Sequence, residues 1–469
     1  MRGILAAAAY VPYNRLQRSK ITQTLGSGGG RGTRAVAAYD EDTTTMGVEA
    51  ARLALRNAGG VTPTAIFYAT ADPAYLDKNN ATAIQAALDL PGNVGAYDAC
   101  GSARSSMGAL VSSANYTWGP ALLVSSDTRT GLAGSGDEAN CGDAAAAVLF
   151  GDDTQGNVIA ELVGGAMATA EFLDRWRTPG NSFTKGWEER FGEAAYSPVI
   201  ESAVKDAYES SGIKPEEIAK VVMTGLAARA VRSAAKFVGV GPDKFVDTQD
   251  GTIGNTGGTH PLMLLAAALE GASAGDVIMV VHAADGCDVA IFKVTEHIKA
   301  YQSARPVAQQ VAEGSDAIDY AKFLTWKGML TREPPRRPDP DRPGAPPSLR
   351  AQDWKFAFVG SQCQACTARN LPPARVCVKC QAVDQMERVN LADVPGTIAT
   401  FTIDRLAFSL SPPMVAAVVD FDGGGRYPLE MADCAPEEVK IGMRVEMTFR
   451  RLYTADGIHN YFWKARPIR

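Results

Sequence analysis

An approximate internal repeat over the first 300 residues limits the possible folds more than any other feature of this sequence. In the first copy, the helical pattern of residues 46–59 ends in glycine, and the apolar run Ala65–Thr70 follows. In the second copy, the helical pattern Val199–Ser211 is closed by Gly212, and the apolar run Val221–Gly225 follows. Alternating helices and strands predict an α/β fold whose sheets are buried between helical layers. Two tandem copies predict a core in which matching elements of the two halves meet.

The later segments of the two copies also correspond. Each copy contains a helix rich in small or apolar residues, then an apolar strand, then a second apolar segment after a turn. The predicted helices cover Gly101–Ser113 and about 261–269, the strands 121–126 and 277–281, and the last segments 142–150 and 286–294. The apolar stretch at residues 1–12 is interpreted as a first core strand, because no convincing signal-peptide cleavage region follows it.

Composition narrows the class of protein. A chain of 469 residues is too long for one ordinary core, so two or three domains are expected. With 46% hydrophobic and 21% charged residues the composition is globular, and a net charge of -6 argues against a nucleic-acid partner. No apolar run reaches the length of a membrane span, so no membrane association is expected. A cytoplasmic location is expected, because the cysteines suit a reducing compartment.

A proline-rich stretch divides the chain. Residues 333–348 contain seven prolines, and proline at that density favours an extended spacer over helix or central strand. The predicted domains are 1–330, with halves of about 1–165 and 166–330, then a linker at 331–350, a zinc ribbon at 351–390 and a small β domain at 391–469.

Four cysteines after the linker form a metal-binding pattern. Cys363 and Cys366 make one Cys-x-x-Cys pair, and Cys377 and Cys380 make a second. Two such pairs supply four thiolates for tetrahedral zinc, and a closed ligand set indicates a structural ion rather than a catalytic one. The predicted strands that follow, 396–403, 415–420, 444–449 and 460–464, favour a five-stranded barrel of the OB type.

Three short motifs suggest a family. They are the segments 40–46, 98–102 and 253–257, which read DEDTTTM, DACGS and IGNTG. Within the repeat, they resemble the thiolase superfamily, in particular the 3-hydroxy-3-methylglutaryl-CoA synthase and ketoacyl synthase III branch. The resemblance covers about residues 1–330. It implies a duplicated αβαβα core, a homodimer, and an acyltransferase that forms or cleaves a carbon–carbon bond next to an acyl-CoA or acyl-carrier thioester.

The C-terminal part carries a second resemblance. The Cys-x-x-Cys pairs, Leu371–Arg375 and Ile441–Val445 resemble a zinc-ribbon plus OB-fold family often paired with thiolase-like proteins. This resemblance covers about residues 350–469. It implies either acyl-CoA binding or a bridging role for this part of the chain.

Cys100 is the candidate nucleophile. It is predicted at a strand-to-helix turn, where the helix dipole and free N–H groups would lower the pKa of its thiol. The small residues after it, Gly101 and Ser102, would let backbone N–H groups polarise a thioester oxygen. The resemblance implies that Cys100 carries the acyl group, and the alternative is a buried structural cysteine. Cys141 and Cys287 are expected to be core residues.

The acid–base partners depart from the family pattern. The resemblance implies a histidine after the strand at Val221–Thr224, and the sequence has none there. His260, in a His-Pro at a predicted helix start, is the candidate replacement, with local backbone capping as the alternative. Asn255 matches the asparagine that the resemblance implies as a donor to a thioester oxygen. His282, at the end of a predicted strand, is a further candidate.

The expected glutamate base is also missing. Asp72 stands in the corresponding loop and is a possible substitute, or a solvated turn aspartate before proline. Arg31 and Arg34, near a glycine-rich loop, are guesses for contacts to CoA phosphates. These departures keep two other functions open, a retro-aldol lyase on an acyl-CoA without cysteine acylation, and a non-catalytic acyl-CoA-binding scaffold.

Overall fold

The computed structural model describes residues 1–336 and 340–469, and the chain divides into two compact units. The first unit contains Met1–Ala37, Glu49–Thr82 and Gly92–Phe323. The second contains Ala38–Val48, Ala83–Pro91 and Leu324–Arg469. Residues 337–339 of the predicted linker 331–350 lie outside the described residues, and the last part of that linker forms helix α11 (Ala345–Arg350).

A mixed sheet forms the framework of the first unit. Within the described residues it has nine strands, in the order β11-β12-β13-β8-β1-β7-β6-β4-β5. Their bounds in chain order are β1 Arg2–Tyr10, β4 Ala65–Thr70, β5 Gly95–Cys100, β6 Ala121–Asp127, β7 Ala144–Asp152, β8 Ala160–Ala168, β11 Ile218–Gly225, β12 Val277–Ala283 and β13 Cys287–Val294.

The strand pairing repeats between the two halves. In the first half β4 is parallel to β6 and β6 is antiparallel to β7, and in the second half β11, β12 and β13 pair in the same way. The halves join where β1 pairs with β8 at Gly3 and Ile4. A Cβ on Gly3 would lie 2.1 Å from the carbonyl oxygen of Ala160, so this close approach requires glycine. The predicted duplicated core is confirmed.

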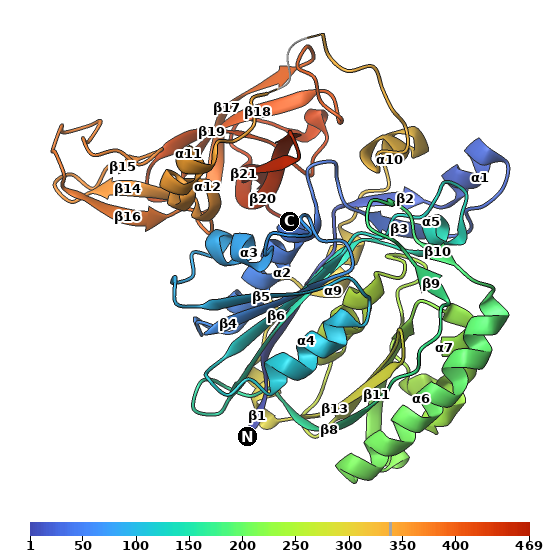
Figure 1. The fold of residues 1–469 in the computed structure, drawn as a ribbon. Helices are drawn as coiled ribbons and strands as arrows, with labels where there is room; N and C mark the ends of the chain where they lie inside the picture. Colours follow the sequence, from blue (N-terminus) through green and yellow to red (C-terminus); the bar gives the residue numbers. More distant parts are fainter. Residues whose placement is uncertain (337–339) are drawn as a thin grey trace. The chain divides into compact units, whose positions relative to one another are not determined.

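Two helices occupy the middle of this unit. Helix α8 (His260–Glu270) is buried nearly all round, as expected for a helix between two sheet layers, and it packs against β1, β7, β11 and β12. Helix α4 (Ser105–Ala114) packs on β4, β5 and β6 (Figure 1). On the outside, α6 (Glu189–Ser211) packs on β8 and β13 beside α7 (Ala228–Ala234).

The remaining elements of residues 1–330 are short or peripheral, apart from the long helix α2. The helices are α1 Ser19–Leu25, α2 Thr43–Asn57, α3 Ala81–Ala87, α5 Gly136–Asn140, α9 Val307–Ala312 and α10 Tyr320–Trp326. The strand pairs are β2 Asn14–Gln17 with β3 Thr33–Val36, and β9 Arg175–Trp176 with β10 Lys185–Gly186. In the described part of the chain, no helix is long and apolar enough to cross a membrane.

The second unit contains two small sheets. Among its described residues, β14 (Val359–Cys363), β15 (Arg369–Asn370) and β16 (Met386–Asn390) form a three-stranded sheet, and α12 (Gln352–Ala357) packs on β14. The other sheet has five strands in the order β19-β18-β17-β20-β21, which agrees with the predicted all-β domain. Their bounds are β17 Gly396–Asp404, β18 Met414–Phe421, β19 Arg426–Glu430, β20 Arg444–Ala455 and β21 Ile458–Pro467.

Buried ion pairs hold three sequence-distant segments of this second unit together. Arg450 is 1% exposed and pairs with Glu41 at 2.8 Å and with Asp433 at 2.5 Å. Lys464, also 1% exposed, pairs with Asp40 at 2.9 Å. Burial alone would raise the pKa of Asp40, but the charges of Lys464 and Arg450 hold that pKa below its usual value. The segment Ala38–Val48 is therefore bonded into the β domain by charge as well as by packing.

Candidate active site

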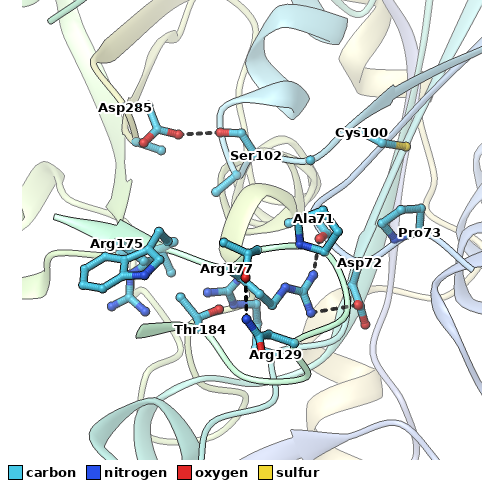
Figure 2. Close-up of a pocket in the computed structure, with 18 of the residues that line it drawn as sticks. Ala71, Asp72, Pro73, Cys100, Ser102, Arg129, Arg175, Arg177, Thr184 and Asp285 are labelled. Carbon is cyan, nitrogen blue, oxygen red and sulfur yellow. Dashed lines mark hydrogen bonds and ion pairs between the residues drawn. The ribbon is translucent and has the colours of Figure 1, made fainter. Parts of the chain in front are cut away.

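A cavity of about 580 Å³ in the first unit contains the predicted nucleophile (Figure 2). It opens where β4 and β5 end, and the irregular segment 174–184 forms one wall. The polar lining residues are Asp72, Tyr75, Asn80, Asp98, Cys100, Ser102, Arg129, Asp174, Arg175, Arg177, Thr178, Asn181, Thr184, Tyr196 and Asp285. Among the described lining residues, none is a histidine or a glutamate.

Cys100 is the last residue of β5, and its side chain is exposed at the cavity. Gly101 follows with a φ of 112°, a conformation that favours glycine, and its N–H donates to the carbonyl of Thr70 at 2.9 Å. That amide is therefore not free to polarise a thioester. Helix α4 begins only at Ser105, so the expected effect of its dipole does not reach the thiol. Although the residue is exposed, the surrounding cavity wall removes part of the water around the thiol, and this desolvation together with the charge of Asp98 raises the pKa of Cys100 to about 12.

The carboxylates nearest to β4 and β5 already have strong partners. Asp98 accepts the backbone N–H groups of Asn80 and Ala81, at 2.7 and 2.8 Å. Asp72, the proposed substitute for the missing glutamate, lines the cavity but forms an ion pair with Arg177 at 3.1 Å and a short hydrogen bond from Thr128. Both carboxylates hold local structure in this conformation of the cavity.

The segment 174–184 brings cations that sequence reasoning missed. Arg175 pairs with Asp137, and Arg177 reaches Asp72 and the carbonyl of Ala71 (Figure 2). This segment lies between the two halves, outside the repeated pattern, and it has little regular structure. No periodic signal therefore marked it.

A second set of polar contacts surrounds Asp285, on the hairpin between β12 and β13. Ser102 donates a hydrogen bond to Asp285 at 2.5 Å (Figure 2), and the amide of Asp285 donates to the Tyr196 hydroxyl at 3.2 Å. Arg104 joins the same hairpin through Asp288 and the carbonyl of Asp285. These contacts fix the hairpin beside the loop that follows Cys100.

Of the predicted acid–base residues, the structure places Asp72 on the cavity wall, but not His260, His282 or Asn255. His260 and His282 are 1% and 0% exposed, and the Nε2 atom of each has no hydrogen-bond partner among the described residues. Asn255 donates its side-chain amide to the Gly225 carbonyl at 2.8 Å and accepts the N–H of Gly257 at 2.9 Å. The three residues lie near the start of α8 and the end of β12, and none of them lines the cavity.

Burial of the two histidines predicts a pH-dependent stability. Burial lowers the pKa of both His260 and His282 to about 4, from an ordinary value of 6.5. Between those values the unfolded chain binds protons that the folded chain does not, so stability falls as the pH falls from 6.5 toward 4. The expected slope is about 1.4 kcal/mol per pH unit for each ring. Urea denaturation at pH 7.5, 6, 5 and 4.5 measures it.

A pair of variants separates this effect from general acid denaturation. His282→Gln should lower the slope by roughly half, while His297→Gln, at an exposed position, should keep the wild-type slope. Equal slopes for H282Q and the wild-type protein would contradict the assignment.

The two arginines suggested for CoA phosphates have different surroundings. Arg34 is fully buried, and it donates to the carbonyls of Glu138 and Arg129 and contacts Asp143 at 3.4 Å. A guanidinium engaged in this way is a core cation, so the suggested phosphate contact does not fit it. Arg31 is exposed in the glycine-rich loop.

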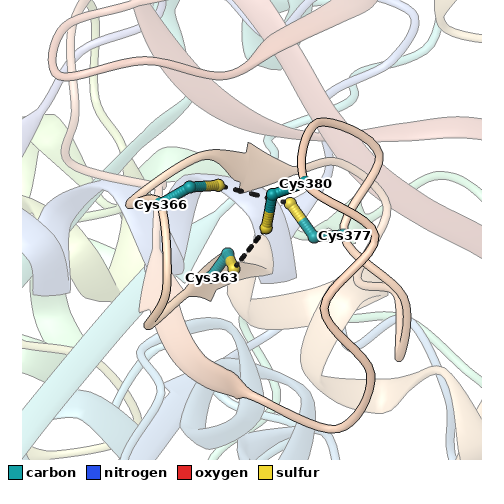
Figure 3. Close-up of side chains that lie close together, drawn as sticks. All are labelled: Cys363, Cys366, Cys377 and Cys380. Carbon is teal, nitrogen blue, oxygen red and sulfur yellow. Dashed lines mark hydrogen bonds between the residues drawn. The ribbon is translucent and has the colours of Figure 1, made fainter.

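The four cysteines of the second unit converge on one point (Figure 3). The sulfur atoms of Cys363 and Cys380 are 3.6 Å apart, as are those of Cys366 and Cys377, and all four lie within 4.8 Å of one another. In a tetrahedral site with zinc–sulfur bonds of about 2.3 Å, two neighbouring sulfur atoms lie about 3.8 Å apart. The two 3.6 Å distances between sulfur atoms are close to this value. The Lys379 amide also points at the Cys377 sulfur, at 3.4 Å. The cluster could hold a metal ion and fits a zinc ribbon.

Comparison with solved structures supports the fold. The chain superimposes on a 3-oxoacyl-(acyl carrier protein) synthase III from Pseudomonas aeruginosa with a TM-score of 0.54 and 17% identity, covering 63% of this chain and 98% of that one. A hydroxymethylglutaryl-CoA synthase structure complexed with CoA gives a TM-score of 0.58 and 15% identity, covering 69% and 89%. Residues 389–450 match the model of the C-terminal OB-fold domain of ChsH2. The thiolase-type core and the OB fold are thus both confirmed.

Comparison of sequences shows the family to which the chain belongs. The hydroxymethylglutaryl-CoA synthase of Methanocaldococcus jannaschii is 29% identical over 351 residues, covering 70% of this chain and 99% of the relative. That of Pyrobaculum aerophilum is 30% identical over 351 residues, covering 70% of this chain and 98% of the relative. With the thiolase-type fold and a cysteine at the cavity, these matches identify the chain as an acyltransferase of the condensing type, and it belongs to the hydroxymethylglutaryl-CoA synthase family.

Proposed function

We propose that the protein forms or cleaves a carbon–carbon bond next to an acyl-CoA thioester, through an acyl group carried on Cys100. The observation that carries this proposal is the position of Cys100, exposed at the end of a core strand and at the wall of the cavity. The family relation supports a CoA thioester as the substrate, since the relatives are named for a CoA ester. The amides of Ser102 and Ala103, next to the thiol, are suitable donors for the developing oxyanion.

The roles of Asn255 and His260 remain predictions. Neither side chain lines the described cavity, and Asn255 already donates its amide to the Gly225 carbonyl, so a direct role for either residue requires a local rearrangement when substrate binds. The zinc assignment for the cysteine cluster is a further part of the proposal, and the sulfur geometry supports it. A homodimer, which the resemblance of the sequence to the thiolase superfamily implies, is also part of the proposal.

One observation favours a second candidate, an aldol-type candidate that is a retro-aldol lyase on an acyl-CoA and leaves Cys100 unacylated. The raised pKa of Cys100 makes the thiolate scarce at neutral pH, and the described cavity lining contains no histidine to accept its proton. The two candidates therefore differ in a measurable way.

Turnover of a Cys100→Ser variant separates them. Acylation at Cys100 predicts a loss of about 10³-fold or more in kcat/KM, because an unactivated hydroxyl is a far weaker nucleophile than a thiol. The aldol-type candidate predicts turnover close to wild type. Carbon–carbon bond formation with acetyl-CoA and acetoacetyl-CoA as probes, followed by chromatography, measures the difference. Near-wild-type turnover in C100S would reject the acyl-cysteine proposal.

A further inference from the structure

We propose that Asp285 is the catalytic base that removes the proton from the carbon next to the thioester carbonyl, and that Ser102 is its positioning residue. This inference rests on the proposed carbon–carbon chemistry in the same cavity. It assigns the acid–base function that the missing glutamate and histidine leave open.

The backbone of Asp285 holds an unusual conformation at the cavity rim. Residues 284–286 connect β12 to β13, and Asp285 has a φ of 49°. A non-glycine residue in this region is strained, and such residues concentrate at functional sites. The surroundings stabilise it: its amide donates to the Tyr196 hydroxyl at 3.2 Å, and its carbonyl accepts from Arg104 at 2.8 Å. Hydrogen bonds to Tyr196 and Arg104 therefore fix the backbone of Asp285 and, through it, the direction of its side chain.

Only one of the two carboxylate oxygens of Asp285 has a hydrogen-bond partner among the described residues. Its Oδ2 atom accepts the Ser102 hydroxyl at 2.5 Å, the short length typical of a charge-assisted hydrogen bond. Its Oδ1 atom has no hydrogen-bond partner among the described residues, and the residue is exposed while lining the cavity that contains Cys100 (Figure 2). One oxygen is thus fixed, and the other is available to accept a proton.

The other carboxylates of the described cavity wall are less suitable. Asp72 is paired with Arg177, and Asp98 accepts two backbone amides. Asp174 faces the Tyr196 hydroxyl, and burial raises the pKa of its carboxyl, which favours the protonated form. Asp285 is the lining carboxylate that combines exposure with a free oxygen.

The proposed step balances within the cavity. Oδ1 of Asp285 takes the α proton of the acyl thioester, and the electron pair of the broken C–H bond moves into the enolate. The enolate carbon then attacks the carbonyl carbon of the second acyl group, whose π electrons move to its oxygen. Collapse of that alkoxide releases a thiolate, which takes the proton from Asp285. In the cleavage direction the same carboxyl returns its proton to the enolate carbon.

Hydrogen exchange at the α carbon tests the base without requiring complete turnover. Acetyl-CoA and propionyl-CoA are incubated with the protein in D₂O, and deuterium in the acyl group is measured by mass spectrometry. Asp285→Asn should lower the exchange rate by about 10²- to 10⁴-fold. Asparagine tolerates the left-handed conformation, and Asp285→Gly removes the carboxylate without backbone strain, so the two variants together exclude misfolding as the cause.

A matched control exists elsewhere in the chain. Asp456 also lies on an exposed hairpin, between β20 and β21, with a φ of 52°, and it is outside the cavity. Asp456→Asn should exchange at the wild-type rate. Ser102→Ala should lower the exchange rate by less than Asp285→Asn does, and Ser102→Thr, which keeps the hydroxyl that bonds Oδ2, should restore it.

The outcomes separate this inference from the proposed function. Exchange that persists in D285N and D285G, or that is absent from the wild-type protein with both probes, would overturn the assignment of Asp285. Failure of wild-type protein to acylate Cys100 while exchange still depends on Asp285 would reject the acyl-cysteine proposal alone.

Discussion

Replacing Cys363 with serine is expected to unfold the three-stranded sheet around the cysteine cluster and to abolish metal retention. Cys363 is buried at the end of β14, and its sulfur lies 3.6 Å from that of Cys380. Structural zinc contributes on the order of 10–16 kcal/mol in small zinc domains, and a site with three ligands loses most of it. Removal of the metal from wild-type protein with a chelator should have the same effect. Zinc content per chain and limited proteolysis within residues 359–390 measure the two results.

Cys434 provides the control for this variant. It belongs to the same unit but not to the cluster, so Cys434→Ser should retain one metal ion per chain and wild-type protease resistance. Freshly purified wild-type protein with far less than one zinc per chain would contradict the zinc assignment. So would a C363S variant as protease-resistant as the wild-type protein.

Replacing Arg450 with methionine is expected to destabilise the second unit by about 3–5 kcal/mol. The substitution leaves Glu41 and Asp433 buried without their shared cation, and Asp40 with Lys464 alone. Breaking a buried ion network from one side costs this much, because an uncompensated charge remains in the interior. Denaturant unfolding followed by tryptophan fluorescence measures the change, since Trp463 is buried in the same unit.

An exposed pair on the same strand provides the comparison. Arg444 pairs with Asp422 at the surface, with side chains 46% and 51% exposed. Arg444→Met should cost less than about 1 kcal/mol. Similar losses for the two variants would show that the buried network contributes no more than surface charge.

Much of the fold could be predicted because local patterns and the global fold agree. The apolar runs Ala65–Thr70 and Val277–Val281 and the apolar helix at 261–269 appear where the periodicity placed them. Strand β8 was not predicted, because its Gly164 and Gly165 weaken the strand signal. The inclusion of Ala38–Val48 in the second unit depends on ion pairs with Arg450 and Lys464, more than 400 positions away, which no local pattern encodes.

Some features of the candidate site could likewise be predicted from the sequence, and others could not. The exposure of Cys100 at a strand end follows from the small residues around it, and the metal cluster follows from cysteine spacing. The raised pKa of Cys100 was not foreseen, because it depends on desolvation of the thiol by the folded cavity wall and on the nearby Asp98. The contact of Ser102 with Asp285 joins positions 183 residues apart, so only the folded hairpin reveals it.

The acyl-cysteine intermediate is tested most directly by intact-protein mass spectrometry. Wild-type protein is incubated with acetyl-CoA or acetoacetyl-CoA and quenched in acid, and the peptide that contains residue 100 is then sequenced. The expected result is a mass increase of one acyl group, located at Cys100 and absent from Cys100→Ala. A protein that turns over these thioesters without labelling, or a label that persists in C100A, would contradict the account.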